Sequence, residues 1–290
     1  MEIKQLLNKG TETISRQYPE REAREMALLY LVHKLGIQRH THIIQPDLEV
    51  ADEDVESALC AYERMASCEP FQYVIGEASF YGRTFNVSPS VLIPRPETEV
   101  LCREILLKSA SAAPCRVLDM CTGSGCIAWT LALEMPGTEV TAVDLSVDAL
   151  SVAASQDFQA EMSESKALAP IFIKADVLKN PPAGLGMFDL IVSNPPYVME
   201  SEKLLMRKNV LEHEPAMALF VPDEDPLVFY RAVSAWATAL LNENGYLIVE
   251  INEALGEITA AVFRQAGFKD VRIIQDLSGR DRFVAASKKS

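Results

Sequence analysis

From residue 116 onward, short apolar runs alternate with segments whose apolar residues recur at helical spacing. Continuous apolar runs separated by helices are typical of a parallel sheet that is covered by helices on both faces. This pattern therefore predicts an α/β fold for the larger part of the chain. The runs lie at residues 117–120, 140–143, 171–173, 190–192, 246–249, 271–274 and 282–285, with helical segments such as 147–159 and 227–241 between them.

Residues 1–75 carry a helical pattern instead. Apolar residues recur at helical spacing from residue 3 to residue 14, and a second helix is expected to open after Pro19 and end at Gly36. A third begins with the acidic residues 52–54, which suit the positive end of a helix dipole. These apolar stripes are interpreted as the core of a small helical bundle.

Residues 76–96 are expected to form a β-hairpin followed by a rigid linker. Strands at 80–81 and 84–87 flank a turn at Gly82 and Arg83. A proline-containing connector then leads into the next helix. We therefore expect three parts, namely an N-terminal helical domain at 1–75, a hairpin and linker at 76–96, and an α/β domain at 97–290.

The charge of the chain argues against nonspecific binding to nucleic acid. Its formal net charge is -14, so phosphate backbones are repelled rather than attracted. Residues 1–80 hold 8 basic and 14 acidic residues, so the helical domain is acidic as well. No apolar stretch approaches a membrane span, and the first residues lack a signal core. We expect a cytoplasmic protein that binds neither membrane nor nucleic acid directly and that is a monomer.

The six cysteines do not indicate a disulfide framework or a metal site. They stand at positions 60, 68, 102, 115, 121 and 126, without a Cys-x-x-Cys pair and without a histidine cluster. With no secretion signal, neither bridges nor zinc are expected. Cys121 and Cys126 flank a glycine loop and are interpreted as small apolar residues.

The glycine loop lies between the first apolar run and a helix. Gly123 and Gly125 allow a ligand to approach the backbone closely, and Asp144 ends the next run at the distance where a carboxylate accepts ribose hydroxyls. The spacing of Gly123, Gly125 and Ala128 also fits the motif of dinucleotide-binding proteins. Alternatively, the loop is a tight turn between strand and helix that binds no ligand. The candidate nucleotide-binding residues here are Asp119, Cys121, Thr122, Gly123, Ser124, Gly125 and Asp144.

Polar residues follow the next two runs as well. Asp176 comes after the third run, where it can accept from an adenine amino group with Val177 beside the ring. Alternatively, Asp176 caps a turn or helix. Asn194 follows the fourth run. Because the carboxyl ends of parallel strands share one edge, where ligands bind, we expect these side chains to lie together with Asp119 and Asp144.

Asn194, Pro195, Pro196 and Tyr197 suit a site that holds a planar NH2 group for alkylation. The two prolines stiffen the loop, and the residue before each is pushed toward extended backbone. The Asn194 amide and the Pro195 carbonyl are then neighbouring acceptors for the two N–H groups of the acceptor. The Tyr197 ring is expected to pack against the flat group. An ordinary Asn-Pro turn is the alternative.

With these motifs, the chain resembles the class I S-adenosylmethionine-dependent methyltransferases. More closely, it resembles the HemK/PrmC family, which methylates the side-chain amide of a glutamine in peptide chain release factors. The resemblance covers nearly the whole length. It is carried by residues 70–76, 93–99, 119–126, 194–197, 214–219 and 276–282.

The resemblance implies a Rossmann-like, mostly parallel seven-stranded sheet, an N-terminal helical domain that docks a class I release factor, and a connecting hairpin. S-adenosylmethionine is the implied cofactor, with Cys121 to Gly125, Asp144, Val177 and Asn194 lining its site. Residues 194–197 are then the catalytic residues and hold the glutamine of a Gly-Gly-Gln motif. The chain departs from the family at Cys121, where glycine is usual, and at Asn252, which follows Glu250 and Ile251.

Other function classes remain open at this stage. An adenine amino-methyltransferase acting on DNA or RNA would use the same four residues 194–197, although a basic recognition region is missing. An NAD-dependent dehydrogenase fits the glycine loop and Asp144 but offers only His213 for hydride transfer. A non-enzymatic binding module is the third alternative.

Overall fold

The computed structural model describes residues 1–109, 115–276 and 278–288. It divides into two compact units, Met1–Glu77 with Met206–His213, and Ala78–Leu205 with Glu214–Ser290. The predicted division at 1–75, 76–96 and 97–290 stays a prediction, because a compact unit need not coincide with a functional domain. Residues 110–114, 277, 289 and 290, which belong to the predicted α/β domain, lie outside the described residues.

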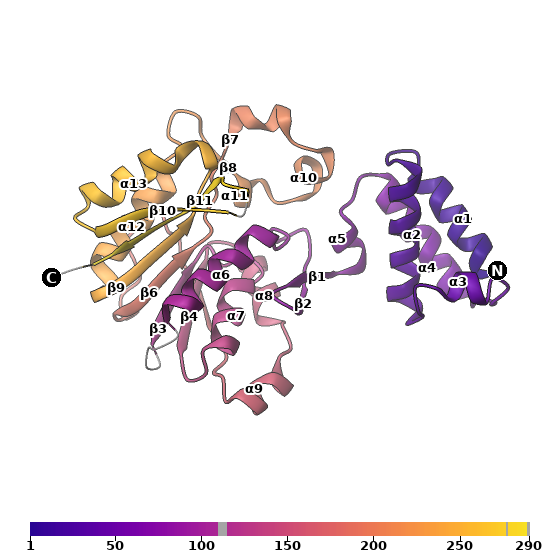
Figure 1. Cartoon of the computed structure of the whole chain (residues 1–290), viewed down its shortest axis with the longest axis horizontal. Helices are drawn as coiled ribbons and strands as arrows, with labels where there is room; N and C mark the ends of the chain where they lie inside the picture. Colours follow the sequence, from indigo (N-terminus) through magenta and orange to yellow (C-terminus); the bar gives the residue numbers. More distant parts are fainter. Residues whose placement is uncertain (110–114, 277, 289–290) are drawn as a thin grey trace. The chain divides into compact units, whose positions relative to one another are not determined.

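The first unit is built from short helices around an apolar core (Figure 1). Its core includes Ile3, Leu7, Leu31 and the ring of Tyr62, all buried. Gly36 ends the second helix with φ 62°, a left-handed conformation that suits glycine. The helices that precede residue 77 are α1 (Ile3–Ile14), α2 (Glu20–Leu35), α3 (Thr41–Ile44), α4 (Asp52–Ala66) and α5 (Phe71–Ile75). The same unit also includes α10 (Lys208–His213), which contributes no described residue to this core.

A seven-stranded sheet forms the centre of the second unit. The strand order is β10-β11-β9-β6-β3-β4-β5, and all neighbours are parallel except the pairs made by β11. The predicted Rossmann-like, mostly parallel seven-stranded sheet is thereby confirmed. The strands are β3 (Arg116–Met120), β4 (Glu139–Asp144), β5 (Ile171–Lys174), β6 (Phe188–Ser193), β9 (Leu241–Glu250), β10 (Lys269–Gln275) and β11 (Asp281–Ser287).

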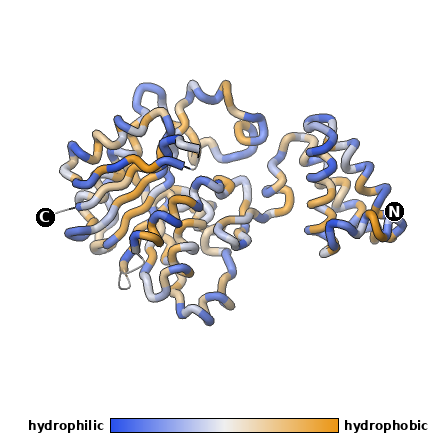
Figure 2. Tube along the Cα trace, viewed as in Figure 1, coloured by the Kyte–Doolittle hydropathy of each residue, from blue (hydrophilic) through white to orange (hydrophobic). Residues whose placement is uncertain are grey.

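Helices cover both faces of this sheet (Figure 1). Successive strand residues alternate between two cores, since Val117 contributes to one and Leu118 to the other. The first core includes α6 and α7, and the second includes α12 and α13. Figure 2 shows the central strands as mainly hydrophobic, as burial on both faces requires. The helices are α6 (Pro96–Ser109), α7 (Cys126–Glu134), α8 (Val147–Ala154), α9 (Gln159–Ser165), α12 (Val228–Leu240) and α13 (Gly256–Gln265).

Small elements complete the second unit at its loops. The strands β7 (Val198–Met199) and β8 (Phe220–Val221) pair in parallel as a separate two-stranded sheet. The helix α11 (Ala216–Leu219) precedes β8, and the 3-10 helices η1 (Glu200–Leu205) and η2 (Glu253–Leu255) follow β7 and β9. No helix within the described residues is both long and apolar enough to span a membrane.

The expected hairpin is present, but its turn is displaced by one residue. The strands β1 (Glu77–Phe80) and β2 (Arg83–Asn86) are joined by Tyr81 and Gly82, not by Gly82 and Arg83. Tyr81 has φ 50° and Gly82 has φ 74°. A two-residue hairpin loop with both central residues at positive φ matches the twist of the strands, so the prediction of this turn was wrong by one position.

The predicted helix at 147–159 is interrupted in the structure. It ends as α8 at Ala154, and α9 starts at Gln159. Between them, the buried Gln156 side chain accepts from the Asn86 backbone N–H at 2.8 Å and donates to the Asn86 carbonyl at 2.9 Å. This pairing with β2 is a tertiary contact, so helical spacing alone did not reveal the break.

Gly10 in α1 offers a test of core packing in the first unit. A Cβ at this position would lie 2.5 Å from the ring of Tyr62, which is fully buried. A Gly-to-Ala change normally stabilises a helix by about 1 kcal/mol, but overpacking costs about 1–3 kcal/mol. We expect Gly10→Ala to lower the free energy of unfolding, as measured by urea denaturation followed by circular dichroism.

The exposed neighbour Lys9 provides the control, because Lys9→Ala changes the same helix without touching the core. An unfolding midpoint for Gly10→Ala that equals or exceeds the wild-type value would contradict the packing argument.

Candidate active site

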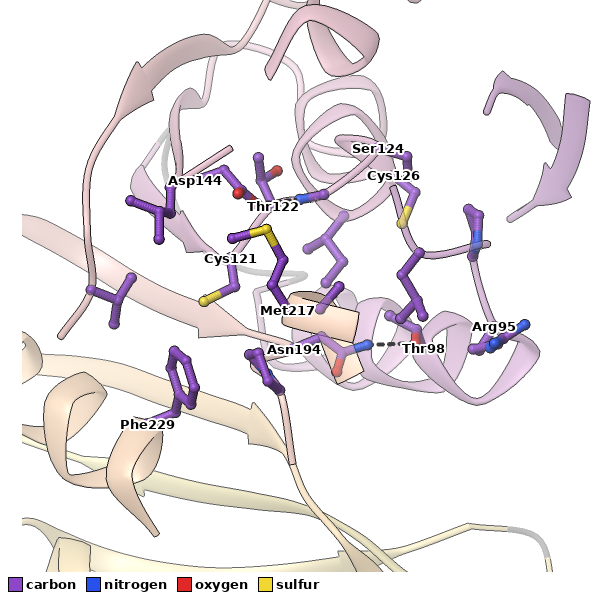
Figure 3. Close-up of a pocket in the computed structure, with 18 of the residues that line it drawn as sticks. Arg95, Thr98, Cys121, Thr122, Ser124, Cys126, Asp144, Asn194, Met217 and Phe229 are labelled. Atoms are coloured by element: carbon purple, nitrogen blue, oxygen red, sulfur yellow. Dashed lines mark hydrogen bonds between the residues drawn. The ribbon is translucent and has the colours of Figure 1, made fainter. Parts of the chain in front are cut away.

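One cavity opens at the carboxyl ends of β3, β4, β5 and β6 (Figure 3). This edge of a parallel sheet is where ligands bind in doubly wound folds. Predicted site residues that line the cavity are Cys121, Thr122, Gly123, Ser124, Asp144, Asp176, Val177, Asn194 and Pro196. Four other predicted residues do not line it, namely Asp119, Gly125, Pro195 and Tyr197.

The loop between β3 and α7 has the backbone that close ligand approach requires. Gly123 has φ 55°, and a Cβ there would meet nothing within 4 Å, so its face is open. At Gly125, with φ 78°, a Cβ would lie 3.0 Å from the Cβ of Ala153 in α8. Gly123 therefore leaves room for a ligand, whereas Gly125 permits close packing of the loop against α8.

Cys121 occupies a position where glycine would be less strained. Its φ is 63°, in the left-handed region that costs an L residue about 1–2 kcal/mol. The side chain lines the cavity, and burial raises the pKa of its thiol. The loop thus accommodates a Cβ where the resembling family usually has glycine.

Asp144 is held in place by backbone donors. One carboxylate oxygen accepts from the Gly123 N–H and the other from the Ser146 N–H, both at 2.9 Å. Burial raises the pKa of this carboxyl. Because each oxygen keeps acceptor capacity, a pair of vicinal hydroxyl groups can still be bound, as expected for a ribose site.

Asp119 lies behind the loop rather than in the cavity wall. It is fully buried, and its Oδ2 accepts from the Thr122 hydroxyl at 2.6 Å. Among the described residues its Oδ1 has no hydrogen-bond partner. Burial raises the pKa of Asp119 to about 7. Asp119 therefore holds the Thr122 side chain in place from behind the cavity wall.

Asp176 caps a turn and also lines the cavity. Its Oδ1 accepts from the Leu178 N–H at 3.0 Å and so caps a turn, while its Oδ2 lies 3.4 Å from Lys179 Nζ. The residue also lines the cavity beside the buried Val177. An adenine-binding role for this pair stays a prediction.

The loop after β6 places only part of its motif in the cavity. Asn194 and Pro196 line the wall. The Tyr197 ring packs at the edge of the second core, and its hydroxyl donates to Glu250 Oε1 at 3.0 Å. The predicted packing of the Tyr197 ring against a flat acceptor group stays a prediction. The hydrogen bond to Glu250 also ties this side chain to the end of β9.

The sequence did not predict the hydrogen bonds that link Asn194 to Thr98 and Thr98 to Glu250. Asn194 Nδ2 donates to Thr98 Oγ1 at 3.2 Å (Figure 3), and this hydroxyl donates to Glu250 Oε2 at 2.8 Å. Thr98 and Glu250 are each 2% exposed. A signal in the sequence was Glu250 itself, an acidic residue at the end of an apolar run that forms the interior strand β9.

The connector before α6 forms another wall that sequence reasoning did not place. Arg95 donates to Glu214 Oε1 at 2.6 Å, and the Ile93 N–H donates to Glu214 Oε2 at 3.2 Å. The Glu214 side chain is buried. Ile93 and Arg95 line the cavity, so Glu214 holds two wall residues in place.

Asn252 is the second position at which the chain differs from the family that it resembles. Its side chain forms hydrogen bonds that hold the loop carrying Tyr197 in place. Its Nδ2 donates to the Tyr197 carbonyl at 3.3 Å and to Glu202 Oε2 at 2.8 Å, and its Oδ1 accepts from the Ala254 N–H at 3.0 Å.

In the part of the chain that is described, no cluster of His, Cys, Asp and Glu could hold a metal ion.

Comparisons with known proteins match both parts of the chain. Residues 5–76 match the PrmC N-terminal domain family, and residues 98–217 match the methyltransferase small domain family. The chain is 38% identical to a release factor glutamine methyltransferase of Bacteroides thetaiotaomicron, over 93% of this chain and 95% of that protein. It is 36% identical to one of Flavobacterium psychrophilum, over 98% of both.

Among solved structures, a 16S rRNA methyltransferase of T. thermophilus in complex with AdoMet and guanosine is similar in fold. It is 19% identical, with a TM-score of 0.50, and the match covers 73% of this chain and 50% of that chain. This similarity supports the α/β methyltransferase fold described above.

The raised pKa of the buried Asp119 carboxyl makes the free energy of unfolding depend on pH. Between its ordinary pKa of 3.8 and about 7, the folded chain keeps a proton on Asp119 that the unfolded chain has lost. The contribution of Asp119 to stability is therefore present at low pH and is lost as the pH rises toward 7. We expect Asp119→Asn to reduce this loss, by up to a few kcal/mol, in urea denaturation between pH 4 and pH 7.

Asp157→Asn, at an exposed carboxyl of the same unit, controls for the change in charge. If Asp119→Asn follows the wild-type curve over this pH range, the assignment of a protonated Asp119 to the folded chain is wrong.

Proposed function

Because the chain belongs to the family of release factor glutamine methyltransferases, we propose that it methylates the side-chain amide nitrogen of a glutamine in peptide chain release factors. S-adenosylmethionine is the methyl donor, and the acceptor is the glutamine of a Gly-Gly-Gln motif. The observation that carries the proposal is that Asn194 lines the same cavity as Gly123 and Asp144. An acceptor for an NH2 group therefore lies beside a nucleotide-type site.

The cavity has the chemical groups that an adenosyl cofactor needs. The open face of Gly123, the two oxygens of Asp144 and the buried side chain of Val177 suit the backbone, hydroxyl and base contacts of a nucleoside. When bound, S-adenosylmethionine supplies an electrophilic methyl group on its sulfonium sulfur.

The task of the protein side chains is to orient a poor nucleophile. The lone pair of a carboxamide nitrogen is delocalised into its carbonyl group. Asn194 Oδ1, in the cavity wall, is the acceptor for one N–H of the glutamine amide. The Pro195 carbonyl, whose residue does not line the cavity, is the proposed acceptor for the other, and the two would fix the orientation of the amide nitrogen. Holding both reactants removes most of the entropic barrier. The same acceptors stabilise positive charge that develops on the nitrogen. The nitrogen gives up one proton after transfer, so no strong general base is required.

The first unit is proposed to dock the release factor. Its match to the PrmC N-terminal domain family supports this role. The formal net charge of -14 disfavours a nucleic-acid substrate, so an adenine amino-methyltransferase is the weaker alternative. A cytoplasmic location and a monomeric state remain predictions.

Asn194→Ala tests the acceptor role. We expect loss of methylation by at least about 100-fold, because the amide of the substrate loses a fixed hydrogen-bond acceptor. Affinity for S-adenosylmethionine should weaken only partly, since Gly123 and Asp144 remain. Mass spectrometry of the release factor after reaction locates and quantifies the added methyl group.

The matched control is Asn180→Ala, at an exposed asparagine of the same unit, which should retain wild-type turnover. Near-normal methylation by Asn194→Ala would rule out the proposed role. A wild-type enzyme that methylates nucleic acid but no release factor would rule out the proposed substrate.

Asp144→Asn tests the cofactor site. The neutral amide accepts hydroxyl hydrogen bonds less strongly than a carboxylate, and such charged hydrogen bonds contribute about 1.5–3 kcal/mol. We expect the dissociation constant for S-adenosylmethionine, measured by isothermal titration calorimetry, to rise about 10- to 100-fold. An unchanged dissociation constant would show that Asp144 does not bind the cofactor.

A further inference from the structure

Glu250 is a buried acidic residue at the carboxyl end of β9, and both of its carboxylate oxygens are occupied by hydroxyl groups. Oε2 accepts from Thr98 at 2.8 Å and Oε1 accepts from Tyr197 at 3.0 Å. Only 2% of the residue is exposed, and it forms no ion pair with any described residue. A buried carboxylate without a counter-ion is costly, and the function proposed above does not yet explain it.

The hydrogen bonds have a direction that the carboxylate imposes. An ionised carboxylate only accepts, so the single proton of the Thr98 hydroxyl is directed to Glu250. Thr98 Oγ1 can then only accept from Asn194, and it does so from Nδ2 at 3.2 Å (Figure 3). Asn194 Oδ1 has no hydrogen-bond partner among the described residues. Glu250 therefore determines which atom of the Asn194 amide remains free.

We propose that Glu250 and Thr98 are positioning residues that keep the oxygen of the Asn194 side chain, rather than its nitrogen, available to the acceptor NH2 group. This inference rests on the proposed function. An NH2 acceptor brings two donors and must meet acceptors. With the Asn194 amide reversed, Nδ2 would face these donors, and two hydrogen-bond donors would oppose each other in a closed site.

Protonation of Glu250 reverses the direction of these bonds. A carboxylic acid can donate to Thr98, whose own proton is then free to bond Asn194 Oδ1. Burial raises the pKa of Glu250, opposed by the bonds from Thr98 and Tyr197. Turnover is therefore expected to fall as the pH decreases through this raised pKa. The other titratable or charged groups around Glu250 are Glu97 and Cys102 of α6, Cys126 of α7, Tyr230 of α12 and Arg282 of β11.

The kinetic test uses Thr98→Val, Thr98→Ser and Glu250→Gln. We expect Thr98→Val and Glu250→Gln to lower kcat about 10- to 100-fold, with the affinity for S-adenosylmethionine nearly retained. Thr98→Ser keeps the hydroxyl and should restore most of the lost turnover. Measured at saturating S-adenosylmethionine, the wild-type kcat should fall at acidic pH, and this acid limb should be absent in Glu250→Gln.

Thr259→Val is the matched control. Thr259 is fully buried in α13, and its hydroxyl has no partner within the described part of the chain. The same loss of a buried hydroxyl should leave both kcat and its pH profile unchanged. Melting temperatures of all variants report whether a loss of turnover arises from a loss of folded protein.

A measurement on the free protein does not depend on turnover. In protein labelled with [15N]asparagine, the side-chain NH2 signals of Asn194 are identified by their loss in Asn194→Ala. We expect these signals to shift with pH as Glu250 is protonated, and to lose this pH response in Glu250→Gln.

The outcomes separate this inference from the proposed function. A wild-type enzyme that does not methylate release factor overturns the proposed function, while the NH2 signals still test the hydrogen bonds. A wild-type enzyme that is active, with Thr98→Val and Glu250→Gln retaining its kcat and pH profile, overturns only the positioning role. Failure of Thr98→Ser to restore turnover, or an Asn194 signal that ignores pH, also overturns it.

Discussion

The register of parallel strands is the constraint on which the site depends. Met120 at the end of β3 pairs with Val143 of β4 on one side and with Ser193 of β6 on the other. The residues that follow these partners are Cys121, Asp144 and Asn194. The carboxyl ends of three strands that are far apart in the sequence therefore lie next to one another at one edge of the sheet. A shift of one residue in either pairing would turn their side chains to opposite faces, so the interior packing of the strands also sets the geometry of the cavity.

The strands and most of the cavity residues could be predicted because their signals are local. An apolar run and the polar residue that ends it are adjacent in sequence, and parallel pairing brings such ends together. This is why Asp144, Asp176 and Asn194 were recognised. Thr98 was missed as a partner of Asn194 because the two lie 96 residues apart, and its other partner Glu250 lies 152 residues away. Such pairings depend on the three-dimensional arrangement of the elements rather than on spacing.

The errors in the predicted elements have the same origin. The hairpin turn was assigned to Gly82 and Arg83 because glycine favours positive φ, yet Tyr81 adopts φ 50° to close the loop. The helix predicted at 147–159 ends early because Gln156 bonds the backbone of Asn86 in β2. A tertiary contact is present at both positions, since the Tyr81 N–H donates to Glu99 Oε1 at 3.0 Å.

The unusual backbone at Cys121 has a consequence for the durability of the protein. A sulfur atom in the wall of a cofactor cavity would ordinarily be a point of attack by peroxides and electrophiles. Attack requires the thiolate, and the enclosed setting that raises the pKa of Cys121 keeps the sulfur in its thiol form at neutral pH. The raised pKa therefore gives the Cys121 sulfur a smaller thiolate fraction, and so a lower reactivity, than an ordinary cysteine.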